Sequence, residues 1–162
     1  MTIETQITFK DFLIFHLKSS LIRFIVYPVI ISVFISINFY NIENGGGEFL
    51  RIVSICVFVF FIFMILQTYF SLKNAFYSNN QIQESIIYTF TNEVIQMKGE
   101  TFEEDFSWNS VYKIKENQDW FLIYQSAQTM NMVSKKDFTK DQILELRNII
   151  KNNHVKSKLR ND

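Results

Sequence analysis

The sequence has little of the chemistry that most enzymes use. Its 162 residues include one cysteine, one proline, four glycines and two histidines. Cys56 stands alone inside an apolar run, which excludes a disulfide framework. His16 and His154 lie at opposite ends of the chain, which disfavours a zinc site or a nucleophilic triad. No glycine-rich phosphate loop occurs either, so we expect no enzyme, no cofactor and no metal site.

Charge is scarce over one part of the chain. Residues 24–72 hold three charged residues, whereas the rest of the chain holds 29. Within that block, residues 24–42 and 52–72 are uncharged, and a helix needs about 20 apolar residues to cross a bilayer. A cleaved signal peptide fits the first run poorly, because that run starts late and is too long. The sequence therefore predicts a transmembrane helical hairpin with a glycine-rich turn at residues 45–47.

Basic residues beside the two runs indicate the orientation. Lys10, Lys18 and Arg23 precede the hairpin and Lys73 follows it, whereas the loop carries Arg51 alone. Cytoplasmic flanks of membrane proteins are enriched in Lys and Arg. We therefore expect a multi-pass protein of the bacterial inner (cytoplasmic) membrane with both termini in the cytoplasm.

Polar residues are few within the first run. Ser32 and Ser36 are four positions apart and Asn38 follows them. One interpretation is a face where another helix packs closely. The other is that these three residues line a pore formed by several copies of the chain.

The polar flanks contain recognisable local patterns. Residues 2–7 alternate as a short strand does, and Thr8 with Asp11 predicts the start of an amphipathic helix ending near Ser20. Thr139 with Gln142 predicts a C-terminal helix. Its apolar stripe comprises Ile143, Leu146, Ile149 and Ile150, and the tail beyond Asn153 is expected to fray.

Six strand-like runs lie between the hairpin and that last helix. They span residues 85–91, 94–98, 101–107, 111–116, 120–125 and 129–134. Their close spacing predicts one antiparallel meander, covered by the C-terminal helix.

Together these patterns predict a membrane α+β fold. We expect an N-terminal strand and amphipathic helix over residues 1–23 and the transmembrane hairpin over 24–72. A connector over 73–80 and a cytosolic antiparallel β domain with its C-terminal helix over 81–162 would follow.

Charge of opposite sign concentrates in two segments. Residues 81–119 have a net charge of −5, and residues 135–160 have a net charge of +5. The basic segment is either a solvated helix or a surface for an anion, such as a lipid headgroup, a nucleotide or an oligonucleotide. Tyr112, Trp120 and Tyr124 could add stacking to such a surface. The candidate anion-binding residues are Lys135, Lys136, Lys140, Arg147, Lys151, Lys156, Lys158 and Arg160.

Three motifs of the polar part resemble a known family. They are SWNSVYKIKE at residues 107–116, WFLIY at 120–124 and VSKKDF at 133–138, just before the final helix. Together with the paired apolar runs, they make the chain similar to the YcxB-like family of small bacterial membrane proteins. The resemblance implies two transmembrane helices and a cytosolic β domain similar to pleckstrin-homology domains. It implies no catalytic residues.

Three functions are consistent with these features. The first is a membrane-anchored, non-enzymatic binding or sensor module that engages a ligand or a partner protein. The second is a homo-oligomeric pore-forming effector, for example in antiphage defence, gated by a nucleotide-type ligand. The third is an immunity protein against a membrane toxin. The expected partners are the lipid bilayer, further copies of the chain, and an anionic ligand or a partner protein.

Overall fold

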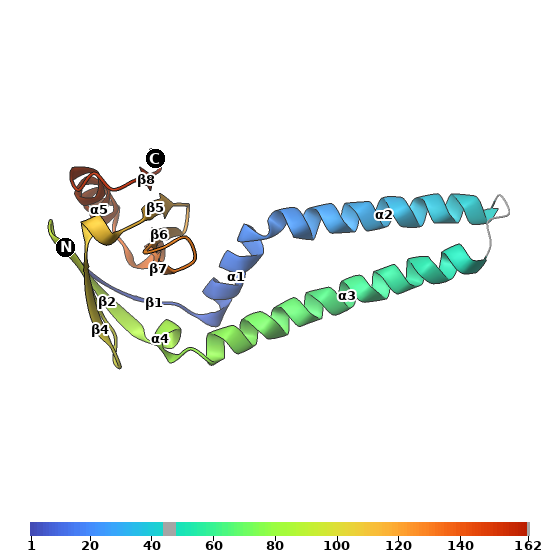
Figure 1. Cartoon of the computed structure of the whole chain (residues 1–162), viewed down its shortest axis with the longest axis horizontal. Coiled ribbons are helices and arrows are strands. Elements are labelled where there is room, and N and C mark those ends of the chain that lie inside the picture. The colour runs from blue at the N-terminus through green and yellow to red at the C-terminus, as the bar shows by residue number, and fades with distance from the viewer. Residues whose placement is uncertain (44–47, 162) are drawn as a thin grey trace. The chain divides into compact units, whose positions relative to one another are not determined.

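The computed structural model describes residues 1–43 and 48–161, apart from the side chains of residues 21–25, 38, 39, 41–43 and 48–50. The predicted glycine turn at residues 45–47 and the side chain of Asn38 lie outside these described parts. The chain has an α+β fold with two compact units (Figure 1). The β unit comprises Met1–Ile7 and Asn80–Asp162, and the helical unit comprises Thr8–Asn79.

This division differs from the predicted one at both ends of the hairpin. The N-terminal segment belongs to two units, because strand β1 (Thr2–Gln6) is part of the β unit and helix α1 (Phe9–Ser19) is part of the helical unit. Helix α3 (Glu48–Tyr77) runs through most of the expected connector, and the short helix α4 (Asn80–Gln83) follows it. The helical unit is thus inserted between two strands of the β unit.

The first sheet of the β unit has the order β1-β2-β3-β4 and is antiparallel throughout. Strand β1 pairs with β2 (Ser85–Phe90) from Thr2↔Thr89 to Gln6↔Ser85. Strands β3 (Val94–Lys98) and β4 (Glu103–Ser107) follow as a hairpin.

The second sheet has the order β7-β6-β5-β8, so the prediction of a single meander was wrong. Its strands are β5 (Lys113–Glu116), β6 (Trp120–Tyr124), β7 (Met130–Ser134) and the two-residue β8 (Ser157–Lys158). The sheets separate at η1 (Trp108–Ser110), where the buried Trp108 donates from Nε1 to the carbonyl of Thr91 at 3.0 Å. All six predicted strand runs are otherwise confirmed within two residues at each end.

The core lies between the inner faces of the sheets and helix α5 (Lys140–Asn152). Tyr88 and Phe90, two residues apart on β2, are almost fully buried, as are Phe121 and Ile123 on β6. Trp120 and Leu122, on the other face of β6, are also buried. Thr139 and Gln142 form the predicted capping box of α5. The predicted stripe is also confirmed: Leu146, Ile149 and Ile150 are buried, and Ile143 packs against the core.

The C-terminal tail does not fray as expected. Its carbonyl at Lys156 accepts from the amide of Ile114 at 2.9 Å, and β8 pairs in parallel with β5. Val155 and Leu159, four residues apart, pack against the core. Apolar contact and backbone pairing therefore hold the tail to the β unit.

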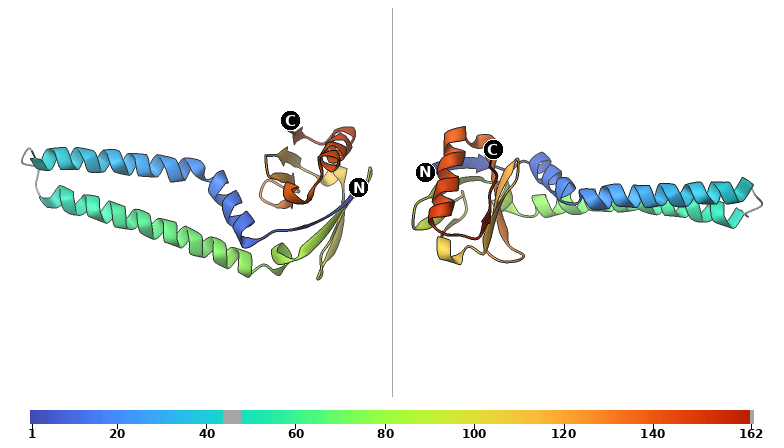
Figure 2. Two further views of the ribbon diagram at one scale, coloured as in Figure 1. Left: turned by 180° about the vertical axis from the view of Figure 1, so that it is seen from behind. Right: turned by 90° about the horizontal axis from the view of Figure 1, so that it is seen from above.

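The helical unit contains α1, α2 (Leu21–Glu43) and α3. The predicted capping box of Thr8 and Asp11 opens α1. Phe9 and Phe12 of α1 pack against Phe76 of α3, with ring centroids 5.7 and 5.5 Å apart. Helices α2 and α3 run antiparallel beside each other (Figures 1 and 2).

Part of α3 is suited to a membrane. Within the described residues, Arg51–Tyr77 is long and apolar enough to cross a bilayer, and α2 contains the shorter apolar stretch Val26–Ile37. Many large apolar side chains of both helices are exposed, including Phe60 and Phe63 of α3 at 62% and 58%. A side-chain surface of this kind is more compatible with lipid than with water.

The turn between β3 and β4 depends on the absence of a side chain at Gly99. A Cβ atom there would lie 2.5 Å from both Glu84 Oε2 and Phe102 Cε1. Glu84 cannot move freely, because its carboxylate accepts from the amides of Glu100 and Thr101 at 2.6 and 2.9 Å and from the Thr101 hydroxyl.

We therefore expect Gly99→Ala to lower the free energy of unfolding of the β unit by about 1–3 kcal/mol, the usual effect of overpacking. Urea unfolding of the detergent-solubilised protein can be followed by fluorescence, since both tryptophans, Trp108 and Trp120, belong to this unit. Asn92→Ala, in the exposed β2–β3 turn, is the control. Equal midpoints for the two variants would contradict the steric argument.

Candidate anion-binding surface

A buried carboxylate organises one side of the β unit. The side chain of Glu116, at the end of β5, has no exposed surface. Its Oε1 accepts from Lys135 Nζ and from Arg147 Nη2, each at 2.7 Å. Its Oε2 accepts from Arg147 Nε and from the backbone amide of Arg160, each at 3.0 Å. We refer to these four residues as the Glu116 cluster.

The cluster keeps Glu116 ionised. Burial alone would raise the pKa of this carboxyl, but the hydrogen bonds from Arg147, Lys135 and the Arg160 amide, with the positive charge of Lys135, hold the pKa below its ordinary value. Because both oxygens already accept hydrogen bonds, Glu116 is suited to a structural role rather than to proton transfer.

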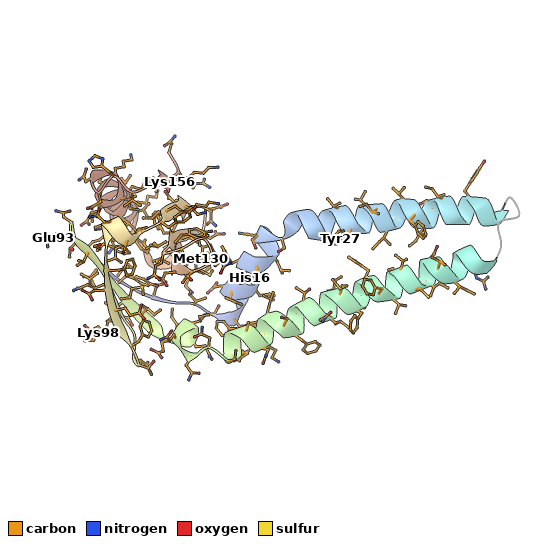
Figure 3. All side chains as sticks on the ribbon, viewed as in Figure 1. His16, Tyr27, Glu93, Lys98, Met130 and Lys156 are labelled. Carbon is orange, nitrogen blue, oxygen red and sulfur yellow. The ribbon has the colours of Figure 1, made fainter. Side chains whose placement is uncertain are left out.

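The Glu116 cluster includes two of the eight predicted anion-binding side chains. Lys135, in η2 (Lys135–Asp137), and Arg147, in α5, are 10% and 8% exposed. The other six are exposed, among them Lys156, which is labelled in Figure 3. Lys140 and Lys151 mark the start and the last turn of α5, about 16 Å apart at 1.5 Å per residue. The remaining four are Lys136, Lys156, Lys158 and Arg160.

A different group of cations gathers on the outer face of the second sheet. Lys113 and Lys115 are two residues apart on β5 and therefore share a face. Lys113 lies opposite Tyr124 of β6, and Lys115 lies opposite Lys158 of β8. With the adjacent Tyr112, these residues form what we call the Lys–Tyr face.

Aromatic rings position the ammonium groups of this face. Lys113 Nζ lies 4.6 Å from the ring centroid of Tyr124 and 5.0 Å from that of Tyr112. Lys115 Nζ lies 5.9 Å from the Tyr124 ring. Both distances for Lys113 fall well within the range of cation–π attraction. In the part of the chain that the structure describes, none of the three lysines forms an ion pair with a carboxylate.

The three aromatic residues predicted to stack on a ligand differ in accessibility. Tyr112 is 49% exposed and Tyr124 is half-buried, whereas Trp120 is 4% exposed. Tyr112 and Tyr124 are thus accessible to a ligand, and Trp120 is not.

Sequence reasoning missed Lys113 and Lys115 because they lie in a segment with a net negative charge. The useful signal was local: in the run from Tyr112 to Lys115, lysine alternates with Ile114, which places both lysines on the side opposite the core.

Acidic residues cluster at Glu100 and at residues 103–105, but among the residues that the structure describes no group of His, Cys, Asp and Glu side chains could hold a metal ion. Glu103, Glu104 and Asp105 lie on the exposed edge strand β4, and Glu103 Oε2 pairs with Lys98 Nζ at 3.4 Å. Charges on an edge strand disfavour pairing with another sheet.

The predicted pore or packing residues lie on α2. Ser32 Oγ donates to the carbonyl of Pro28 at 2.7 Å, and Ser36 Oγ donates to that of Ser32 at 2.8 Å. Both serines are exposed. A groove of about 440 Å³ in the helical unit is lined by other residues, among them Tyr27, Phe60 and Met64.

Removing one cation from the Glu116 cluster tests its structural role. We expect Arg147→Ala to lower the free energy of unfolding by about 3–5 kcal/mol at neutral pH, because it leaves a buried carboxylate short of a partner. The folded-state pKa of Glu116 is depressed, so this stabilisation is complete above the unfolded pKa and is lost as the pH falls through the folded pKa.

The difference between the wild type and Arg147→Ala should therefore shrink in acid, as measured by urea unfolding at a series of pH values. Lys140→Ala, an exposed change on the same helix, is the control. A pH-independent difference would argue against an ionic role for Arg147.

One protein-family model matches part of the β unit. The model of the YcxB-like protein family matches residues 90–150, from the end of β2 to the last turn of α5. No curated protein and no solved structure matches the chain. The three motifs noted in the sequence lie within the matched region. The resemblance to the YcxB-like family is thus confirmed for residues 90–150.

Proposed function

We propose that this protein is a membrane-anchored, non-enzymatic binding module. In this proposal α2 and α3 form a two-helix transmembrane hairpin with both termini in the cytoplasm. The β unit, with two sheets and a C-terminal helix in a pleckstrin-homology-like arrangement, binds a phosphate-bearing anion. The observation that carries the proposal is the Lys–Tyr face.

The chemistry of the Lys–Tyr face is suited to phosphate. Three lysines on one face, which pair with no carboxylate among the described residues, attract an anion. A charge-assisted hydrogen bond to phosphate is about twice as strong as a neutral one. The Tyr112 and Tyr124 rings hold Lys113 in place, which lowers the conformational entropy lost on binding. Anionic lipid headgroups and soluble polyphosphates both carry this chemistry.

Hydrogen bonding within α2 and α3 supports the anchoring role. Ser32, Ser36 and Thr68 each donate to the backbone carbonyl four residues earlier. These hydroxyls are therefore satisfied without water, as a bilayer requires. Since they need no aqueous lumen, this arrangement favours an anchor over a homo-oligomeric pore.

Inorganic tripolyphosphate is a probe for the Lys–Tyr face. With the full-length protein in nanodiscs of zwitterionic lipid, we expect Lys113→Ala combined with Lys115→Ala to weaken tripolyphosphate binding at least ten-fold. The reason is that each lost cation contributes roughly 1 kcal/mol. Isothermal titration calorimetry measures the affinity. The wild type is also measured in nanodiscs of anionic lipid. A weaker apparent affinity for tripolyphosphate there than in zwitterionic lipid would indicate that lipid headgroups compete for the Lys–Tyr face.

The matched control is Lys98→Ala combined with Lys140→Ala, which removes the same charge from exposed positions outside the Lys–Tyr face. If both double variants lose affinity equally, binding depends on net charge and the assignment to this face is wrong.

The hairpin is tested by accessibility. In a Cys56→Ser background, we expect Gly46→Cys to react with a membrane-impermeant maleimide in intact spheroplasts. Lys158→Cys should react only after the membrane is permeabilised. The physical basis is that two spans return the chain to the side where it started. Labelling of both positions in intact spheroplasts would contradict the topology.

A further inference from the structure

The edge of β5 that does not pair with β6 is covered by β8, within residues 155–160. β8 extends the second sheet by two residues, and its side chains are exposed. Besides this pairing, the tail inserts Leu159 beside the core and supplies the Arg160 amide to Glu116. Residues 155–160 thus bind β5 as a separate extended segment would, by main-chain pairing with apolar side chains at intervals.

The turn that returns the tail to β5 contains a strained residue. His154, directly after α5 and Asn153, has φ 52°. For a residue other than glycine, this left-handed conformation is unfavourable. One hydrogen bond supports it, from the His154 amide to the Lys151 carbonyl at 3.1 Å.

We propose that the β5 edge also binds residues 155–160 of a second copy of this chain, so that two copies exchange their tails. The tail is the segment that demonstrably fits this edge, and an exchanged tail makes the same contacts as the original one. The contacts of the tail therefore contribute equally to the free energy of the closed and the exchanged arrangements. The difference between the two depends on the conformation of the turn at His154 and on the local concentration of second copies. Opening the hinge relieves the left-handed conformation, and confinement to one membrane raises the concentration of second copies.

Exchange would make the proposed binding surface a composite of two copies. Lys158 lies opposite Lys115 on the Lys–Tyr face, and it moves with the tail. After exchange, Lys113, Lys115 and both tyrosines come from one copy and Lys158 comes from the other. The anion would meet the same side chains in both arrangements, so exchange changes which copy supplies Lys158 and does not require the proposed anion.

Disulfide trapping in native membranes tests the exchange. Full-length chains with Cys56→Ser carry either Lys115→Cys or Lys158→Cys, with different tags, and are co-expressed. Paired Cα positions of neighbouring strands are close enough for a disulfide. After oxidation, we expect a heterodimer on a non-reducing gel. Chains with both substitutions supply the reference for bonding within one copy, and Lys140→Cys in place of Lys158→Cys measures random collision.

Substitutions at His154 should change the heterodimer yield in opposite directions. Proline cannot adopt a positive φ and lacks the amide that donates to Lys151, so His154→Pro should raise the heterodimer yield several-fold. Glycine removes the penalty of the left-handed turn, so His154→Gly should lower the yield, by up to about ten-fold.

A yield equal to the collision control, in the parent pair and in His154→Pro alike, would overturn the proposal. An equal yield in the proline and glycine variants would do the same. The readout is independent of anion binding, so tail exchange and the proposed function can fail separately.

Discussion

The order of the C-terminal half depends on compensating one buried charge. Glu116 is fully enclosed, and an ionised carboxylate in that position is unfavourable unless its oxygens are hydrogen-bonded and its charge is paired. Compensation comes from η2 through Lys135, from α5 through Arg147 and from the tail through the Arg160 amide. A single side chain of β5 therefore brings three segments together. Because Lys135 and Arg147 pair with Glu116 in the interior, they are not available to bind an anion at the surface.

The pairing of β1 with β2 imposes a second constraint. The helical unit lies between these strands in the sequence, yet Gln6 pairs with Ser85 in the sheet. Closing a long loop costs only slightly more entropy than closing a shorter one, and the helices in this loop are themselves ordered. As a consequence, the β unit is discontinuous in sequence. A fragment starting at residue 81 would lack the edge strand β1 and leave the backbone of β2 unpaired on that side.

Much of the fold could be predicted because its signals are local. The capping boxes at Thr8 and Thr139, the apolar stripe of α5 and the alternation in the strands each depend on residues within a few positions of one another. The split into two sheets could not be predicted, because short-range alternation does not record which strands pair, and β4 and β5 follow each other in the sequence yet belong to different sheets. The ordered tail was missed for the same reason, since its partners Ile114 and Glu116 lie on β5.

The sequence by itself determined the apolar runs, the type of the longer helices and of strands β1 to β7, and the resemblance to a family over residues 90–150, since composition and short-range spacing carry that information. Tertiary structure alone decided which cations a ligand can reach. Lys135, Arg147 and the Arg160 amide bind a carboxylate 19, 31 and 44 residues away, and no short-range pattern records such a partner. Lys158 joins Lys113 and Lys115 on one face only because β8 pairs with β5. Whether a charge is compensated or accessible depends on distances in space, and the fold sets those distances.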